Sequence, residues 1–327
     1  MILACCACVW GGRGGVLGDG RWRDYRNNPV ISPGPAGSWD AWAVMSMTVV
    51  EAGGTFHLYY EGGLTGCKDL QIGHATSIDG LVWVKDPANP VLRPGESGQW
   101  DDGAVWDPFV IREDGVFKMW YGGERKGIGD YQCGYAVSAD GVRFEKKGRI
   151  SGFDFGEMAD MHVVHDRQAG RYYMFYWDRS FRTPQRLRLA VSPNETDFDF
   201  DNSIAIRIAG EQPGHRYTHV FRRGDRWHMY YGFDGGPPRS GCAAGSDLVH
   251  WLAVDRQMPE TEDAEILLIG GEPRLMFYCP AGMQDEGGCD IRLKVPEKRV
   301  QDPFFGVFTG RGAGGMMDFP SADVAQW

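Results

Sequence analysis

The sequence predicts an all-β fold, a five-bladed β-propeller with four antiparallel strands in each blade. The first observation is an internal repeat without gaps. Trp39-Asp40 recurs as Trp100-Asp101, and the same spacing carries Gly54 onto Gly115 and Asp79-Gly80 onto Asp140-Gly141. The second is composition, because 13% aromatic residues and 47 glycines suit short strands joined by tight turns. A unit that recurs in this way indicates a repeat architecture.

Residues 100–123 show how one unit is built. The β-branched pair Val110-Ile111 ends at Glu113-Asp114-Gly115, which is a hairpin signal, and a strand resumes over residues 116–121. Pro108 stands at the first residue of the strand, where proline is tolerated. Asp107 therefore directly precedes the strand.

Five such units follow one another, and the fifth is the weakest match. A single four-stranded unit cannot bury both of its faces, so stacking of the units around an axis is expected. The second strand of each unit ends in an aromatic pair, which we expect to form the core of each blade. These pairs are Tyr59-Tyr60, Trp120-Tyr121, Phe175-Tyr176, Tyr230-Tyr231 and Phe277-Tyr278.

The repeats divide the chain into three parts. Residues 29–295 form the expected propeller, which would be the catalytic domain. Residues 1–28 are read as a leader or linker, and residues 296–327 as a Gly-rich tail whose structure the pattern does not decide. The apolar start of the chain holds three cysteines, Cys5, Cys6 and Cys8. It resembles a lipoprotein cleavage box without the basic region of a signal peptide, so it is either a remnant of an export signal or a leader without structure.

Composition and cysteine spacing exclude some classes of function and bear on the cellular compartment. A net charge of -10 argues against nucleic acid as a partner, and no apolar run is long enough to cross a membrane. No cysteine or histidine spacing indicates a metal site, so neither a metal nor another cofactor is expected. An extracytoplasmic location is expected, as a periplasmic, secreted or lipid-anchored protein. In that case Cys279 and Cys289 could pair, and otherwise they would be buried thiols. The oligomeric state is left open.

The first strand of every propeller blade lines the central channel, so residues at the starts of these strands converge. Acids that converge on one pocket raise one another's pKa values. One of them can then stay protonated while another is ionised, as glycoside hydrolysis requires. An Asp at a strand start also often caps the neighbouring turn. The candidate catalytic residues are Asp107, Asp160, Glu157 and Asp40. The candidate substrate-binding residues are His162, His219, Tyr217, Trp106, Asp102, Glu265 and Arg182.

Local motifs resemble those of the five-bladed propeller glycoside hydrolases, the superfamily that includes families 43, 32, 68, 62, 117 and 130. The hairpin over residues 54–60 is similar to the first-blade hairpin of family 32. Trp106-Asp107-Pro108 resembles the second-blade motif of families 32 and 130, and Asp140-Gly141 lies in a typical blade ending. The resemblance covers residues 29–295 and implies a role for Asp107 as transition-state stabiliser, as tuner of a neighbouring acid or as the acid itself. The first-blade Asp of these families is replaced by Met45-Ser46.

The resemblance implies a glycoside hydrolase that acts on an oligo- or polysaccharide through a carboxylate cluster at the mouth of the channel. Two alternatives stay open. One is a phosphorylase, in which phosphate replaces water as the nucleophile and a basic cluster lies beside Asp107. The other is a propeller that binds carbohydrate without cleaving it, which the loss of the first-blade acid favours.

Overall fold

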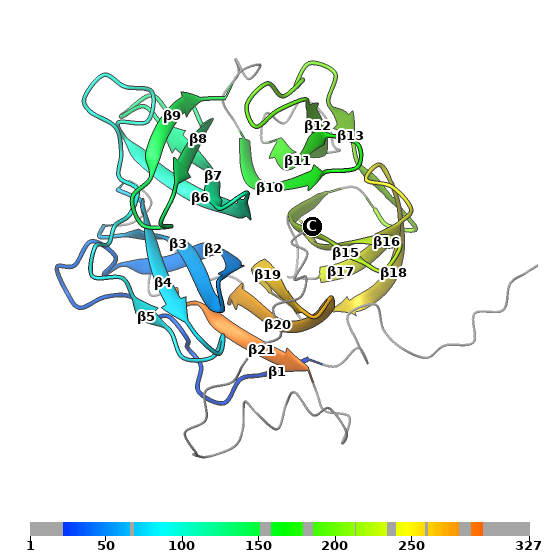
Figure 1. Cartoon of the computed structure of the whole chain (residues 1–327), viewed down its shortest axis with the longest axis horizontal. Coiled ribbons are helices and arrows are strands. Elements are labelled where there is room, and N and C mark those ends of the chain that lie inside the picture. The colour runs from blue at the N-terminus through cyan, green and yellow to red at the C-terminus, as the bar shows by residue number, and fades with distance from the viewer. Residues whose placement is uncertain are drawn as a thin grey trace, which may run out of the picture.

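The computed structural model describes residues 22–65, 69–150, 158–178, 186–212, 214–233, 240–258, 261–280 and 289–296. Over these residues every regular element is a strand, and the strands form five separate sheets. The sheets are arranged radially around a central axis, which confirms the predicted five-bladed propeller (Figure 1). No helix of the described residues is long and apolar enough to cross a membrane.

The first two blades have the expected order, with each strand paired to the next one along the chain. Their hairpins close at turns such as Asp114-Gly115, where both residues have positive φ as a tight hairpin requires. The strands of these blades are β2 (Ala43–Ala52), β3 (Thr55–Gly63), β4 (Gln71–Ser77), β5 (Val84–Lys85), β6 (Ala104–Glu113), β7 (Val116–Glu124), β8 (Gln132–Ser138) and β9 (Glu145–Arg149).

The third and fourth blades repeat this order, and the fourth carries one strand more than predicted. The additional strand, β14, pairs in parallel with β18 at the outer edge of the blade. The strands are β10 (Met158–Asp166), β11 (Arg171–Asp178), β12 (Leu187–Ser192), β13 (Ile204–Ala205), β14 (Arg207–Ala209), β15 (His215–Arg223), β16 (Arg226–Phe233), β17 (Ser240–Gly245) and β18 (His250–Met258).

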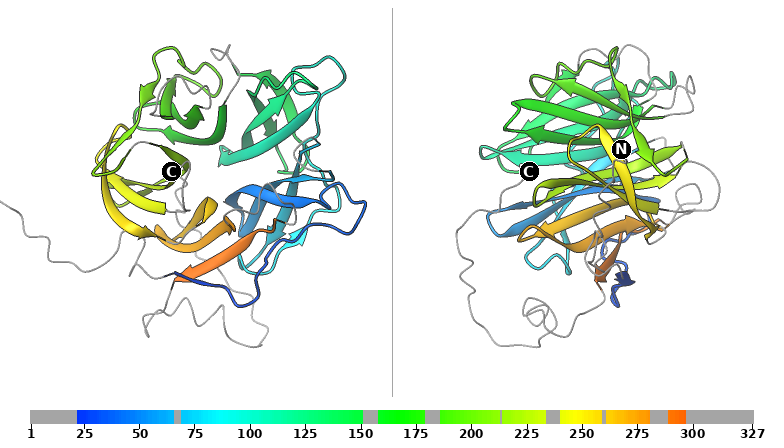
Figure 2. Two further views of the ribbon diagram at one scale, coloured as in Figure 1. Left: turned by 180° about the vertical axis from the view of Figure 1, so that it is seen from behind. Right: turned by 90° about the vertical axis from the view of Figure 1, so that its right-hand side faces the viewer.

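The fifth blade is built from both ends of the described chain. Its inner strands are β19 (Glu262–Ile269), β20 (Glu272–Cys279) and β21 (Arg292–Pro296), and its outer strand is β1 (Trp22–Asp24). β1 pairs antiparallel with β21, and Figure 2 shows the two side by side at the edge of the ring. The expected leader, residues 1–28, therefore ends too late, because residues 22–28 already belong to the propeller.

The aromatic pairs of the second strands form the blade cores, as predicted. All ten residues are buried, and none exposes more than 4% of its surface. Burying a side chain of this size contributes about 1.5–3 kcal/mol each. Contacts also cross between blades, since the Tyr59 hydroxyl donates to the Gly141 carbonyl (2.8 Å) and Trp83 meets Phe277 edge-on at 5.6 Å. The stacking of blades thus follows from side chains that a single blade leaves uncovered.

The cysteines of the described residues are free thiols. Cys279 and Cys289, for which both a disulfide and buried thiols were considered, are fully buried and unpaired by a disulfide. Cys5, Cys6 and Cys8 lie outside the described residues, as does the tail from residue 297 onward.

Candidate functional site

The innermost strand of every blade has an irregularity at the same place. The pairing register with the second strand shifts by one residue there, in β2, β6, β10, β15 and β19. At four of the five shifts a non-glycine residue has positive φ, which is uncommon and costs energy. These residues are Ser46 (φ 42°), Asp107 (45°), Asp160 (52°) and Asp263 (48°).

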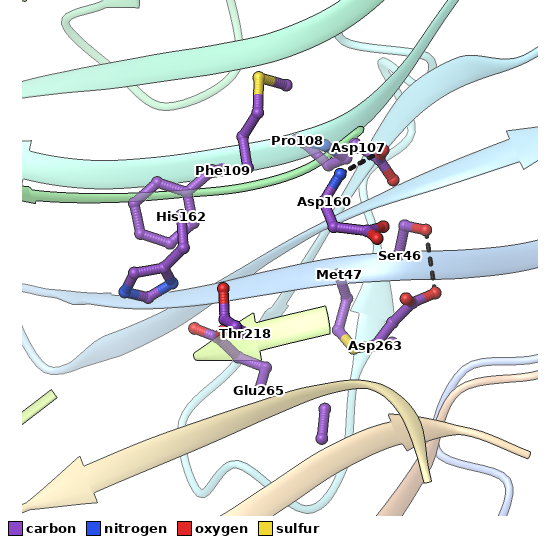
Figure 3. A pocket seen from close by; sticks show the side chains of 12 residues that line it. Ser46, Met47, Asp107, Pro108, Phe109, Asp160, His162, Thr218, Asp263 and Glu265 are labelled. Carbon is purple, nitrogen blue, oxygen red and sulfur yellow. Dashed lines mark hydrogen bonds between the residues drawn. The ribbon is translucent and has the colours of Figure 1, made fainter. Parts of the chain in front are cut away.

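These bulges gather carboxylates at one mouth of the channel. Asp107, Asp160 and Asp263 line a cavity of about 60 Å³ together with Ser46 (Figure 3). The Asp160 backbone N–H donates to Asp107 Oδ2 at 3.2 Å, and the Ser46 hydroxyl donates to Asp263 Oδ2 at 3.1 Å. Asp tolerates the left-handed conformation better than most residues, so the bulge and its acid suit one another. We refer to Asp107, Asp160, Asp263 and Glu61 as the mouth acids.

Glu61 joins this group from the second strand of the first blade. It is buried on β3, and its Oε2 accepts the backbone N–H of Asp107 at 3.0 Å. Burial raises the pKa of Glu61 well above its ordinary value, and the negative charges of Asp107 and Asp263 raise it further. The mouth thus holds a carboxyl group that resists ionisation.

Asp263 also binds its proton more tightly than an ordinary Asp. Burial raises its pKa from 3.8 to about 7, and the charges of Asp107 and Glu262 act in the same direction. Arg216 opposes this shift, because its positive charge favours the ionised carboxylate. A pKa near the working pH suits a group that donates a proton during the reaction.

Arg216 on β15 of blade four contacts residues of blades three and five beside Asp263. Its Nη2 lies 3.8 Å from Glu262 Oε1, and its guanidinium stands 5.3 Å from the ring centre of Trp177. Arg186 contacts the same indole, at 5.9 Å. Positive charge therefore lies next to the acids.

A second layer of residues lies deeper in the channel, at one common register of the inner strands. Each member lies opposite the first residue of the aromatic pair on the following strand of its blade. The layer consists of Thr48, Phe109, His162, His219 and Glu265. His219 Nδ1 lies 2.6 Å from Glu265 Oε2, and the rings of His162 and His219 are 4.8 Å apart.

Five of the predicted residues lie in these two layers. Asp107 and Asp160 lie together at the mouth, as expected. His162, His219 and Glu265 lie in the deeper layer, so Glu265 is not the fifth-blade counterpart of Asp107, and Asp263 takes that place. The alignment was wrong by the two residues that separate them. Tyr217 belongs to β15, but its side chain is outside the described part of the structure, and Glu157 and Arg182 are outside it altogether.

The other three predicted residues stabilise the fold away from the cavity. Asp40 is buried, and its Oδ2 accepts hydrogen bonds from Lys85 Nζ (2.5 Å) and the Tyr60 hydroxyl (3.3 Å). Asp102 accepts the backbone N–H groups of Gly98 and Lys126, which lowers its pKa. Trp106 is buried edge-on against Tyr131 at 5.2 Å. None of the three is among the residues that line the cavity.

Two mouth acids were missed by reasoning from the sequence. Asp263 lies in a run with Glu262 and Glu265, and only the bulge decides which carboxylate faces the mouth. Glu61 had a signal in the repeat itself, because the same spacing places it on Gly122 of the second blade. An acid that replaces a glycine directly after the aromatic pair marks the position.

Comparison with known proteins agrees with this fold. No protein-family model matches the chain. An uncharacterized protein of Mycobacterium tuberculosis is 33% identical over 172 residues, which are 49% of this chain and 56% of that protein. The 1,2-beta-oligomannan phosphorylase of Thermoanaerobacter is 26% identical over 212 residues, 56% of this chain and 64% of the enzyme. Raffinose invertase of Escherichia coli is 27% identical over 190 residues, 54% of this chain and 38% of the enzyme. The chain thus spans about half of the length of these curated relatives.

Solved structures are similar over most of the chain. A family 117 glycoside hydrolase of Zobellia galactanivorans superposes with a TM-score of 0.66 at 15% identity, over 87% of this chain and 93% of that one. An exo-beta-1,3-galactanase of Phanerochaete chrysosporium gives 0.61 at 16% identity, over 81% and 63%. The resemblance to the propeller glycoside hydrolases, expected from the sequence, is confirmed for the fold.

Proposed function

We propose that this protein cleaves glycosidic bonds in an oligo- or polysaccharide at the mouth of its channel. The observation that carries this proposal is the set of mouth acids, of which Asp107, Asp160 and Asp263 line one small cavity and Glu61 accepts the backbone N–H of Asp107. Glycoside cleavage requires one carboxylic acid that donates a proton and one carboxylate that assists the nucleophile. The fold shared with glycoside hydrolases supports the same class of reaction.

Asp263 is proposed as the proton donor to the leaving oxygen. Its pKa of about 7 keeps a large fraction protonated at neutral pH, whereas an ordinary Asp would be ionised. Asp160, which lies on the third blade and lines the same cavity, would be the base that takes a proton from the attacking water. Asp107 links Glu61 and Asp160, because its backbone N–H donates to Glu61 and its side chain accepts the N–H of Asp160, and its charge raises the pKa of Asp263, so it would tune its neighbours.

The test is turnover of aryl glycosides and of plant and algal polysaccharides by the purified protein, with Asp107→Asn beside it. We expect Asp107→Asn to lose more than about a hundredfold of kcat, in line with loss of an essential electrostatic partner. Asp102→Asn is the matched control, because Asp102 only caps a loop and should leave kcat unchanged. Normal turnover by Asp107→Asn with an intact fold would refute the assignment.

Phosphorolysis is the second candidate, and two observations favour it. The match to the phosphorylase relative covers 64% of that enzyme's length, and Arg216 places a guanidinium near the mouth acids that suits the binding of an anion such as phosphate. Turnover that requires inorganic phosphate would assign this class, and turnover in water alone would assign a hydrolase. Sugar binding without any turnover would leave the protein as a binding propeller, consistent with Ser46 in place of the first-blade acid.

A further inference from the structure

Two guanidinium groups lie over one indole near the mouth acids, although the chain as a whole carries a net charge of -10. Arg186 stands 5.9 Å and Arg216 stands 5.3 Å from the ring centre of Trp177. We call Arg186 and Arg216 the arginine pair. We propose that the arginine pair binds a carboxylate carried by the sugar substrate, so that the protein acts on saccharides that contain a uronic acid. This inference rests on the proposed function and adds the class of sugar to it.

Trp177 and Arg186 bring this subsite up to Asp160 in blade three. Trp177 on β11 lies opposite Ala159, which directly precedes Asp160. Arg186 lies just before β12, and its carbonyl oxygen accepts the backbone N–H of Asp178 at 2.8 Å. The strand pairing thus keeps Arg186 beside the indole.

Arg216 approaches from blade four, on the side of Asp263. Burial raises the pKa of Asp263 and the charge of Arg216 acts against it, so the guanidinium lies within electrostatic reach of this acid. Arg216 Nη2 lies 3.8 Å from Glu262 Oε1, which is an ion-pair distance but too long for a hydrogen bond. A guanidinium carries five N–H donors, more than one carboxylate can occupy. A second carboxylate can therefore bind beside Glu262.

The repeat shows that the fold does not require a cation at this place. In every blade, the last inner-strand residue before the register shift lies opposite the residue that follows the aromatic pair. In the first three blades this inner-strand residue is apolar, and the fourth blade alone has a cation there. The five pairs are Met45 and Glu61, Trp106 and Gly122, Ala159 and Trp177, Arg216 and Gly232, and Glu262 and Cys279. A ligand therefore explains Arg216 better than packing does.

The indole of Trp177 prepares the arginine pair for an anion. Trp177 is buried, and a guanidinium over an indole is held by cation–π attraction. An arginine that is already held in place loses less side-chain freedom when it binds, and its planar fork matches the two oxygens of a carboxylate.

A carboxylate on the sugar suits this place better than inorganic phosphate does. It brings one negative charge, whereas phosphate brings up to two at neutral pH, and Glu262 and the mouth acids repel each added charge. A carboxylate attached to the sugar also arrives together with the glycosidic bond. Its binding energy can then help to hold that bond against Asp263.

The experiment measures binding and cleavage of matched acidic and neutral saccharides by the full-length protein in phosphate-free buffer. Oligosaccharides of pectin, alginate and glucuronoxylan are compared with the same oligosaccharides after chemical reduction of their carboxyl groups, which removes the charge and keeps the linkage. Calorimetry gives Kd, and release of reducing sugar gives kcat and KM. We expect at least one acidic oligosaccharide to bind about tenfold or more tightly than its reduced form.

Two variants test the arginine pair itself. Arg186→Gln and Arg216→Lys should each weaken binding of the acidic oligosaccharide by about tenfold to a hundredfold and leave binding of its reduced form unchanged. Arg216→Lys keeps a positive charge near Asp263 and removes the planar fork, so KM should change more than kcat. Arg222→Gln is the matched control, because Arg222 lies on the same strand over another indole, that of Trp227, at 5.5 Å, and its loss should leave both affinities unchanged.

The outcomes separate this subsite from the proposed function. Cleavage of neutral saccharides with no preference for an acidic form would refute the subsite and leave the proposed function standing. Binding of an acidic oligosaccharide that depends on the arginine pair, without cleavage, would support the subsite and refute the proposed function. Equal losses for both forms in the variants, or a phosphate requirement that disappears with the arginine pair, would also overturn the subsite. The preference of the wild type decides the question even if a variant fails to fold.

Discussion

Asp263→Asn should make the protein more stable at alkaline pH, although it removes the proposed proton donor. The folded protein raises the pKa of Asp263 to about 7, against 3.8 for the ordinary group. Between these two pH values the folded chain binds a proton that the unfolded chain has lost. Stability contributed by this group is thus present below about pH 3.8, falls as pH rises through this window, and stays lost above pH 7.

The magnitude follows from the size of the shift. About 3 pKa units at 1.36 kcal/mol per unit give an upper bound of about 4 kcal/mol. The side chain lines an open cavity, so solvent screening reduces the expected gain to about 1–3 kcal/mol at pH 8. Asn keeps an acceptor for the Ser46 hydroxyl and tolerates the φ of 48°, so the substitution introduces no strain of its own.

The assay is urea unfolding, followed by tryptophan fluorescence, of wild type and Asp263→Asn between pH 4.5 and 8. The difference in free energy of unfolding should be largest at pH 8 and shrink toward pH 4.5. Asp101→Asn is the control, because this buried carboxylate is ion-paired with Lys146 at 2.6 Å, and its loss should destabilise the protein. If Asp263→Asn is less stable at pH 8, or its effect does not change with pH, the electrostatic account of the mouth is wrong.

Three further predictions concern the scaffold. Asp40→Asn removes the charge that pairs with Lys85. It should lower the free energy of unfolding, measured in urea, by about 1–3 kcal/mol and leave kcat unchanged. A loss of kcat without a loss of stability would mean that Asp40 belongs to the active site. Burial lowers the pKa of His57 to about 4, so as pH drops the unfolded chain gains a proton before the folded chain does. The free energy of unfolding should therefore fall between about pH 6.5 and 4. In urea unfolding, His57→Gln should lose about 1–2 kcal/mol of that pH dependence, after allowance for solvent screening. Gly122→Ala would place a Cβ 2.3 Å from Trp106 Nε1 and should cost about 1–3 kcal/mol, seen as a lower Tm; an unchanged Tm would mean that the indole moves away freely.

The fold could be predicted because the repeat is visible in the sequence. Asp114-Gly115 marks its hairpin locally, and the aromatic pairs mark each second strand, so both the number of blades and their cores follow. β1 could not be predicted in this way. It has three residues with no periodicity, and the strand that pairs with it lies at the other end of the chain, where Lys294 reaches Asp24 across 270 positions.

The site was predictable only where a strand start is visible in the sequence. Asp107 and Asp160 are such residues. Asp263 depends on a bulge, which a sequence does not display, and Glu61 enters from a second strand while the prediction considered first strands alone. His162 and His219 were predicted as substrate-binding residues, but their contact with each other was not, because they meet through equal register in different blades.

The pairing of β1 with β21 bears on how this chain reaches its native state. The first strand has no sheet to join until the last one has been synthesised, so the fifth blade cannot be completed during translation of the other four. Closure of the ring is a contact between distant parts of the sequence, and such contacts form slowly. Until then the edge of β21 offers unpaired backbone groups to other chains. Aggregation during refolding should therefore depend on protein concentration more strongly than stability does, and the seam between the two ends is where it would begin.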